Sequence, residues 1–295
     1  MSAPGSTTVA RTRRGWLHEE RALVLTAVMF LTRIPVPADI DHSADRLARS
    51  TRWFPLVGLA VAAVGAVAGG LGAALWHPAI GAVLAVLATV RVTGAFHEDA
   101  LADACDGFGG GWTAERVLEI MRDSRVGAFG VVGLGLVTLL RIGALALVAT
   151  QGVAALAVAL AVAHVTARWS SLPLIRFLPY ARPDGGTGKP FAAGLSAPGF
   201  AIGSATWLGV LALALGDVRT AAIVGAATCL VTWRAGRYFV RRIGGITGDC
   251  LGATNQVVET ITYLVLALPA FAPVAAPWWA SLGRTLADAV AHRGW

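Results

Sequence analysis

Residues 91–130 read RVTGAFHEDALADACDGFGGGWTAERVLEIMRDSRVGAFG, an acidic stretch set between long apolar runs. It holds seven of the chain's 17 acidic residues. Asp99, Asp103 and Asp106 recur at spacings of four and three, so on a helix they fall within about 60° of one another. Carboxylates on one stripe repel each other unless a cation lies between them, and oxygen ligands without a companion His/Cys set suit Mg²⁺ better than zinc. The stretch therefore predicts a magnesium site, with Glu98 as a further candidate ligand.

Basic residues and glycines follow the acidic stripe. Arg122 and Arg125 flank Asp123 within one helical turn, and the arginine fork suits phosphate oxygens. Gly107 is expected to end the helix and to let a ligand approach the backbone closely. Metal-binding carboxylates beside phosphate-binding arginines favour phosphoryl-type transfer. The structural alternative is a solvated acidic turn between two membrane spans.

The composition is that of an integral membrane protein. Of 295 residues, 56% are hydrophobic and only 14% are charged, whereas soluble domains carry about 25% charged residues. We therefore expect an all-α polytopic bundle of about seven transmembrane helices, preceded by a short interfacial or half-spanning helix over 22–31 whose crossing of the membrane is left open. The expected spans are 54–76, 79–96, 126–149, 153–172, 198–216, 219–237 and 257–275. The expected domains are a disordered basic N-terminus over 1–15, one integral-membrane catalytic domain over 16–276 and a C-terminal tail over 277–295.

The distribution of positive charge predicts the orientation of the bundle. Net charge is +7, and most Lys and Arg residues lie in or beside the four long segments 35–53, 97–125, 173–197 and 238–256. A count of seven crossings brings these segments to one face, which the positive-inside rule makes cytoplasmic. We expect residues 39–52 to form a charged loop there. The positive charge needs no nucleic acid to explain it, and no nucleic-acid-binding motif is present.

Two loops far from the acidic stripe supply further candidates on the same face. GGITGDCLGA at 244–253 is glycine-rich and carries Asp249, which we predict to complete the metal–diphosphate site from the opposite side, with Glu259 as a further contributor. Its carboxylate is expected within roughly 8 Å of one on the stripe. Lys189 is a substrate-binding candidate, for which a solvated loop lysine is the alternative. Arg141 lies deep in an expected span, where its side chain can snorkel towards the far interface.

The predicted site is thus a set of carboxylates with phosphate-binding neighbours. The catalytic and metal-binding candidates are Glu98, Asp99, Asp103 and Asp106, with Asp249 as an additional metal ligand. The substrate-binding candidates are Gly107, Arg122, Asp123, Arg125, Lys189 and Asp249. Which carboxylate acts as the general base is left open by the sequence.

An ordered set of motifs resembles the cobalamin synthase family, the adenosylcobinamide-GDP ribazoletransferases. The matching pieces are FLTRIPVP at 30–37, RWFPLVG at 52–58, TGAFHEDALADACDG at 93–107, RVLEIMRDSRVGAFG at 116–130, LPYAR at 178–182 and GGITGDCLGA at 244–253. Ala95 and Ala100 stand where glycine is frequent in the family. Both are small-for-small changes, for which we expect packing adjustments rather than lost activity.

The resemblance implies a Mg²⁺-dependent transferase of late cobalamin (vitamin B12) biosynthesis. The hydroxyl of α-ribazole, or of its 5′-phosphate, would attack the phosphoryl group joined to cobinamide in adenosylcobinamide-GDP, releasing GMP. The implied location is the cytoplasmic (inner) membrane with a cytoplasmic active site, and the implied partners are the two substrates, the lipid bilayer and other cobalamin-assembly enzymes. The alternatives are a CDP-alcohol phosphotransferase-like enzyme, a cation transporter and a non-catalytic membrane anchor. The aspartate pattern of the first of these is absent, and the second needs acids on several spans.

Overall fold

A computed structural model describes residues 13–37, 43–182, 191 and 194–269, and within them the chain folds into α-helices joined by short turns. The helices up to the acidic stretch are α1 (Arg13–Leu31), α2 (Ala44–Ser50), α3 (Phe54–Leu75), α4 (Pro78–Thr93), α5 (Phe96–Gly110) and α6 (Ala114–Ile120), with the 3-10 turn η1 (Thr51–Trp53) before α3. The later helices are α7 (Ala128–Ala149), α8 (Val153–Phe177), α9 (Ala197–Ala214), α10 (Val218–Ile243) and α11 (Gly248–Leu266). The all-α prediction is confirmed for these residues.

Fewer helices qualify as single membrane spans than the seven expected. Four stretches of the described chain are long and apolar enough: Ala44–Leu75, which ends in α3, and the helices α7, α8 and α9. The helices α4 and α5 qualify only as a pair, which is bent by 90°. The helix α10 covers the expected span 219–237, and α11 overlaps the expected span 257–275 as far as Leu266; neither helix qualifies. The composition of the described helices therefore indicates a multi-pass membrane protein with four or five candidate spans.

The bend between α4 and α5 has a local cause in the backbone. Gly94 (φ 67°) and Ala95 (φ 58°) both lie in the left-handed region, so the fourth helix ends at Thr93 rather than at residue 96 as expected. This conformation costs an alanine about 1–2 kcal/mol, and within the described chain Ala95 alone adopts it without being glycine. Arg33 stabilises the bend, because its backbone N–H donates to Val92 O at 2.7 Å and its side chain lies against Gly94. The bend sets the direction in which the acidic helix α5 leaves α4.

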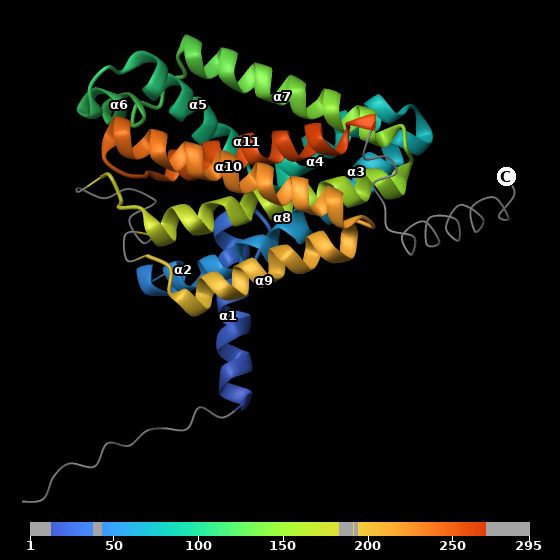
Figure 1. The fold of residues 1–295 in the computed structure, drawn as a ribbon, viewed down its shortest axis with the longest axis horizontal. Helices are drawn as coiled ribbons and strands as arrows, with labels where there is room; N and C mark the ends of the chain where they lie inside the picture. Colours follow the sequence, from blue (N-terminus) through green and yellow to red (C-terminus); the bar gives the residue numbers. More distant parts are fainter. Residues whose placement is uncertain (1–12, 38–42, 183–190, 192–193, 270–295) are drawn as a thin grey trace, which may run out of the picture.

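The N-terminal part is more helical than its charge pattern suggests. Part of the expected charged loop is the helix α2, because Ser43 accepts the N–H of Arg46 and starts a helical turn. The helix α1 begins at Arg13, well before the expected apolar segment. Its Glu19 pairs with Arg49 at 2.7 Å, and its Glu20 accepts a hydrogen bond from Trp53 Nε1 at 3.0 Å. These contacts hold α2 and η1 against α1. In Figure 1, α1 runs roughly at right angles to the long helices, and its beginning projects beyond them.

The helix α8 forms the centre of the bundle and is buried along most of its length. Small residues allow its neighbours to approach closely, as is common between helices in lipid. A Cβ at Gly58 of α3 would collide with the backbone at His164 of α8. On the other side, the rings of Trp169 and Trp207 of α9 stack at a centroid distance of 3.8 Å. The helices α7, α8, α9 and α10 run along the long axis (Figure 1), so their loops meet at the two ends of the molecule.

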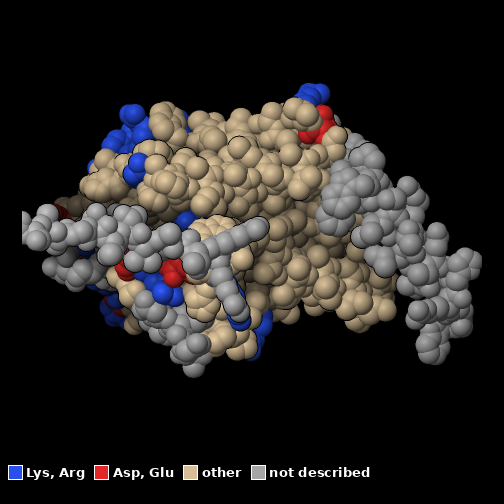
Figure 2. All heavy atoms as spheres, turned by 90° about the horizontal axis from the view of Figure 1, so that it is seen from below, with Lys and Arg blue, Asp and Glu red and all other residues tan. Residues whose placement is uncertain are grey.

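Charged side chains are distributed unevenly over the surface along the long axis of the molecule. Figure 2 shows Lys, Arg, Asp and Glu gathered mainly at one end of the visible face, with a broad uncharged belt beside them. The charged end corresponds in Figure 1 to the end that carries α6 and the ends of α8 and α10. An apolar belt bordered by charged ends is the pattern of a protein embedded in a bilayer.

Candidate active site

The carboxylates of α5 lie in different surroundings although they are close in sequence. Asp99 is exposed, Asp103 is half-buried, and both Glu98 and Asp106 are buried. The expected stripe Asp99–Asp103–Asp106 therefore runs from the surface into the protein. Glu98 and Asp99 point to different sides because successive helical residues are rotated by about 100°. The five expected metal ligands thus separate into groups with different partners.

Asp106 caps a neighbouring helix. Its Oδ2 accepts the N–H of Gly127 at 2.7 Å, and its Oδ1 accepts the N–H of Gly130 at 2.8 Å. These N–H groups belong to the first turn of α7, which has no helical acceptor for them. A Cβ at either glycine would collide with the carboxylate. The DSRVGAFG segment therefore needs its two glycines to receive Asp106, and this capping role is not among the catalytic and metal-binding roles that the sequence predicts for Asp106.

Glu98 belongs to a buried network of charged groups. Its Oε1 accepts hydrogen bonds from Arg141 Nη1 at 2.9 Å and from Gln256 Nε2 at 3.2 Å. Arg141 Nη2 donates to Glu259 Oε1 at 2.8 Å, and Arg141 also donates to Gln256 Oε1. Arg141 is only 1% exposed, so the expectation that it snorkels to an interface is wrong. Both Glu98 and Glu259 face this guanidinium, which makes them structural acids in the present arrangement.

The network continues into α8. His164 Nδ1 lies 3.3 Å from Glu259 Oε2 and 3.0 Å from Arg168 Nη1. The buried carboxylates Glu98 and Glu259 are thus matched by two buried guanidinium groups. Buried charges persist in a protein interior only when they are paired and hydrogen-bonded in this way. The network joins α5, α7, α8 and α11 through side chains from four segments of the sequence.

Asp249 lies in the first turn of α11, a helix that packs against the acidic helix α5. The two helices pack closely, because a Cβ at Gly252 would collide with Ala100 of α5. Asp249 and Asp103 each lie about one turn from this contact, and the charges of Asp249 and Asp103 interact. Asp249 also interacts with Asp99. The structure therefore places Asp99, Asp103 and Asp249 near enough for their charges to act on one another, at the end of the α5–α11 contact.

A single arginine compensates part of this negative charge. Arg182 Nη2 donates to Asp249 Oδ2 at 2.7 Å, and Arg182 also acts on Asp103. The hydroxyl of Thr247 also donates to Asp249 Oδ2, at 3.3 Å. The loop carrying Arg182 is held by the parallel bridge between Tyr180 and Ile246. Arg182 ends the LPYAR motif, but the sequence reasoning gave it no role at the site.

Of the other predicted substrate-binding residues, Asp123 and Arg125 line a pocket of about 440 Å³ together with Asp106. Arg125 is exposed and pairs with Asp123 at 2.5 Å, and its hydrogen bonds lower the pKa of Asp123 to about 2. Arg122 is exposed. Gly107 does not end the helix, because α5 continues to Gly110; a Cβ at Gly107 would collide with Met121, so this glycine admits the segment after α6. Lys189 lies outside the described residues.

A pocket beside Asp99 offers room for a substrate. It has a volume of about 690 Å³ and is lined by Asp99, Arg33, Phe30 and Phe96, together with the left-handed turn at Gly94 and Ala95. Arg33 and Phe30 belong to the FLTRIPVP motif, for which the sequence alone indicates no function. The bend at Ala95 thus forms part of the wall of this pocket. Residues in strained backbone conformations are often found at functional sites.

The donor chemistry fits a magnesium ion, although the ligands are not assembled. No three His, Cys, Asp or Glu side chains within the described ranges converge closely enough to hold a metal. Asp99, Asp103 and Asp249 nevertheless offer hard oxygen donors, and Arg182 acts on two of them, Asp103 and Asp249. Mg²⁺ prefers one or two carboxylates supplemented by waters and substrate phosphates, so it does not require a complete protein cage.

Comparison with known proteins agrees with these features. The family model described as cobalamin-5-phosphate synthase matches residues 23–267. An adenosylcobinamide-GDP ribazoletransferase of Ralstonia nicotianae is 44% identical over 251 residues, covering 85% of this chain and 96% of the relative. The proteins of the same name from Shewanella amazonensis and Vibrio cholerae are 39% and 38% identical, covering 84% and 85% of this chain and 96% and 95% of the relatives. No solved structure matches this chain significantly. The acidic helix, the capped α7 and the Asp249 loop therefore lie within a chain that belongs to the cobalamin-5-phosphate synthase family.

Proposed function

We propose that this protein is an adenosylcobinamide-GDP ribazoletransferase that uses the carboxylates at the α5–α11 contact as its active site. The observation that carries the proposal is the similarity to curated proteins of that name over 85% of the chain, with Asp99, Asp103 and Asp249 brought together. In the reaction, a hydroxyl of α-ribazole or its 5′-phosphate attacks the phosphoryl group attached to cobinamide. A new P–O bond forms, the P–O bond to GMP breaks, and the hydroxyl proton passes to a carboxylate of the site.

The residues present suggest how the charges of this reaction are managed. Asp99 and Asp249 would hold Mg²⁺, which supplies charge neutralisation for the diphosphate when it is bound. Arg182 and Arg33 lie at the two sides of this set and are suited to binding phosphate oxygens. Asp103 is half-buried beside the other carboxylates, which makes it our candidate for the proton acceptor.

The activity is tested with purified full-length protein in detergent or in vesicles. Adenosylcobinamide-GDP and Mg²⁺ are supplied with either α-ribazole or its 5′-phosphate, and GMP and the cobalamin product are quantified. Equimolar GMP and cobalamin product are expected. The matched control is Arg234→Gln, which changes an exposed arginine of α10. Failure to release GMP with either acceptor, from protein that melts cooperatively, would contradict the proposal.

We further propose seven crossings, with the helices α3, α4, α7, α8, α9, α10 and α11 in the cytoplasmic membrane and the active site on the cytoplasmic face. The support is the gathering of charge at the end that carries α6 and the ends of α8 and α10 (Figures 1 and 2). Single cysteines in the segments 39–52, 183–189 and 244–249 are expected to react with a membrane-impermeant maleimide only in inverted vesicles. Reaction of any of them in right-side-out vesicles would contradict this topology. Association with other cobalamin-assembly enzymes stays a prediction.

A further inference from the structure

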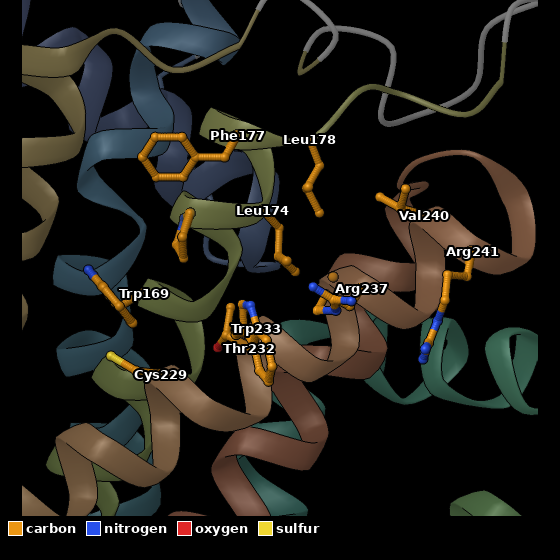
Figure 3. A pocket seen from close by; sticks show the side chains of 12 residues that line it. Trp169, Leu174, Phe177, Leu178, Cys229, Thr232, Trp233, Arg237, Val240 and Arg241 are labelled. Atoms are coloured by element: carbon orange, nitrogen blue, oxygen red, sulfur yellow. The ribbon is translucent and has the colours of Figure 1, made fainter.

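A groove separate from the Asp99 pocket runs between α8 and α10. Figure 3 shows Trp169, Leu174 and Phe177 on one wall and Trp233, Arg237 and Arg241 on the other. Its volume is about 520 Å³, within the range of small-molecule sites. It shares no lining residue with the Asp99 pocket. The groove is therefore a second place where a ligand of substantial size fits.

The α10 wall changes from apolar to basic along its length. Cys229, Trp233, Arg237 and Arg241 line the groove at successive spacings of four residues, so they form one stripe of about 18 Å. The opposite wall is largely apolar, and Gly236 allows it to approach because a side chain there would press on Leu174 and Leu178. One end of the groove is thus suited to a hydrocarbon chain, and the other end is suited to an anion.

The polar groups of the groove lack matching partners among the described residues. The Thr232 hydroxyl is buried without a hydrogen-bond partner although its residue lines the groove. Arg237 lies over the ring of Trp233 at 5.3 Å, a contact that leaves its N–H donors available. The residues that line the groove include two arginines and no carboxylate. An unsatisfied buried hydroxyl and uncompensated guanidinium groups point to a ligand that brings acceptor oxygens.

We propose that this groove binds one molecule of an anionic phospholipid. Its acyl chain lies along Trp169, Leu174 and Trp233, and its phosphate accepts hydrogen bonds from Arg237 and Arg241. The Thr232 hydroxyl donates to an ester oxygen, since Thr232 precedes the basic end by about one turn. The helix α8 is one of the candidate spans and ends beside this basic end. An acyl chain and a phosphate in this order match the change from bilayer interior to interface.

The test compares lipids of different charge in the full-length protein. Nanodiscs are prepared from phosphatidylcholine alone or with phosphatidylglycerol, and the Tm is measured for the wild type and for an Arg237→Gln/Arg241→Gln variant. Phosphatidylglycerol is expected to raise the Tm of the wild type by about 3 °C. The double variant should lose most of this rise. The matched control is Arg234→Gln, which removes an exposed arginine of α10 that does not line the groove and should keep the full rise.

A second measurement locates the lipid without altering any arginine. Cys229 is exposed in the groove, whereas Cys105 is half-buried elsewhere on α5. Phosphatidylglycerol should slow the modification of Cys229 by a maleimide and leave the rate at Cys105 unchanged. An equal Tm rise in the double variant, or equal rates at Cys229 with and without phosphatidylglycerol, would overturn the proposal. Because neither readout uses the transferase reaction, failure here leaves the proposed function unaffected.

Discussion

The helices α5 and α11 carry two sets of acidic residues. The two sets differ in whether arginine side chains of the protein neutralise their negative charge. Glu98 and Glu259 are buried and share the guanidinium of Arg141 at 2.9 and 2.8 Å. Asp103 and Asp249 lie nearer the end of the helix contact, where Asp249 pairs with Arg182 and Asp99 is exposed. The first set is neutralised by the protein, and the second keeps an excess of negative charge. That excess is what a site for a cation and a phosphorylated substrate requires.

The difference shows that acidic density alone does not identify a metal site. Carboxylates that are matched one for one by buried guanidinium groups, as Glu98 and Glu259 are by Arg141 and Arg168, form a structural set, because removing a partner leaves an uncompensated charge in a low dielectric. A carboxylate surrounded by other carboxylates is unfavourable without a ligand and gains from binding one. Substitutions in the two sets should therefore change different properties of the protein.

The largest effect is expected at Arg141, which holds the buried set together. Arg141→Gln leaves Glu98 and Glu259 without their shared partner, and breaking a buried pair costs about 3–5 kcal/mol. The Tm measured in detergent should fall by about 10 °C. The double variant Arg141→Met/Glu98→Gln should recover much of that loss, because the remaining buried carboxylate, Glu259, keeps Arg168 as its counter-charge. An Arg141→Gln variant that melts with the wild type would mean that the network contributes little.

The next effect is expected at Asp103, in the set that the protein leaves uncompensated. Asp103→Asn keeps the size of the side chain and removes its charge. Turnover at saturating substrates should fall by at least about 100-fold, while the Tm stays the same or rises because repulsion from Asp99 and Asp249 is relieved. Rates are measured across a Mg²⁺ titration, so that a weakened metal affinity is separated from a lost group. Normal turnover at limiting Mg²⁺ would exclude Asp103 from the site.

Asp106 distinguishes a capping role from a metal-binding role. Asp106→Asn keeps one acceptor oxygen and loses the other, so one bond to the start of α7 is broken at a cost of about 1 kcal/mol. Stability should fall modestly, and turnover should fall far less than in Asp103→Asn. An equal loss of turnover in the two variants, measured under the same conditions, would support a metal-binding role for Asp106.

The smallest effect is expected at Arg182, which links the open set to the protein. Arg182→Gln removes the positive charge beside Asp249 and makes the site more negative. The Mg²⁺ concentration for half-maximal activity should fall by about two- to five-fold, and the KM for adenosylcobinamide-GDP should rise, because a partner for phosphate is lost. For Arg182→Lys, both the Mg²⁺ concentration for half-maximal activity and the KM should lie between the values of Arg182→Gln and those of the wild type. A KM that does not change would remove Arg182 from substrate binding.

Several features of the site could be read from the sequence because they depend on local spacing. Asp99 and Asp103 lie one turn apart on a real helix, as their spacing predicts. The charge of Asp249 acts on Asp103 from a distant segment, and the sequence predicts that the two segments lie on one side because the apolar runs imply helices whose ends return there. The roles of Asp106 and Arg141 could not be read in this way. Asp106 contacts Gly127 and Arg141 contacts Glu259 because of the way α7 and α11 pack. Residue spacing along a single helix does not predict this packing.

The sequence by itself determined the helical class, the apolar character and the concentration of carboxylates in one stretch, because these follow from composition and from a period of about 3.6 residues. Only the tertiary structure decided which acids are neutralised. The helix α7 carries Arg141 to Glu98 and Glu259, and the turn after α8 carries Arg182 to Asp249. Charge compensation acts over a few ångströms in space. It therefore depends on which helices meet, and neighbouring residues such as Glu98 and Asp99 can face different partners.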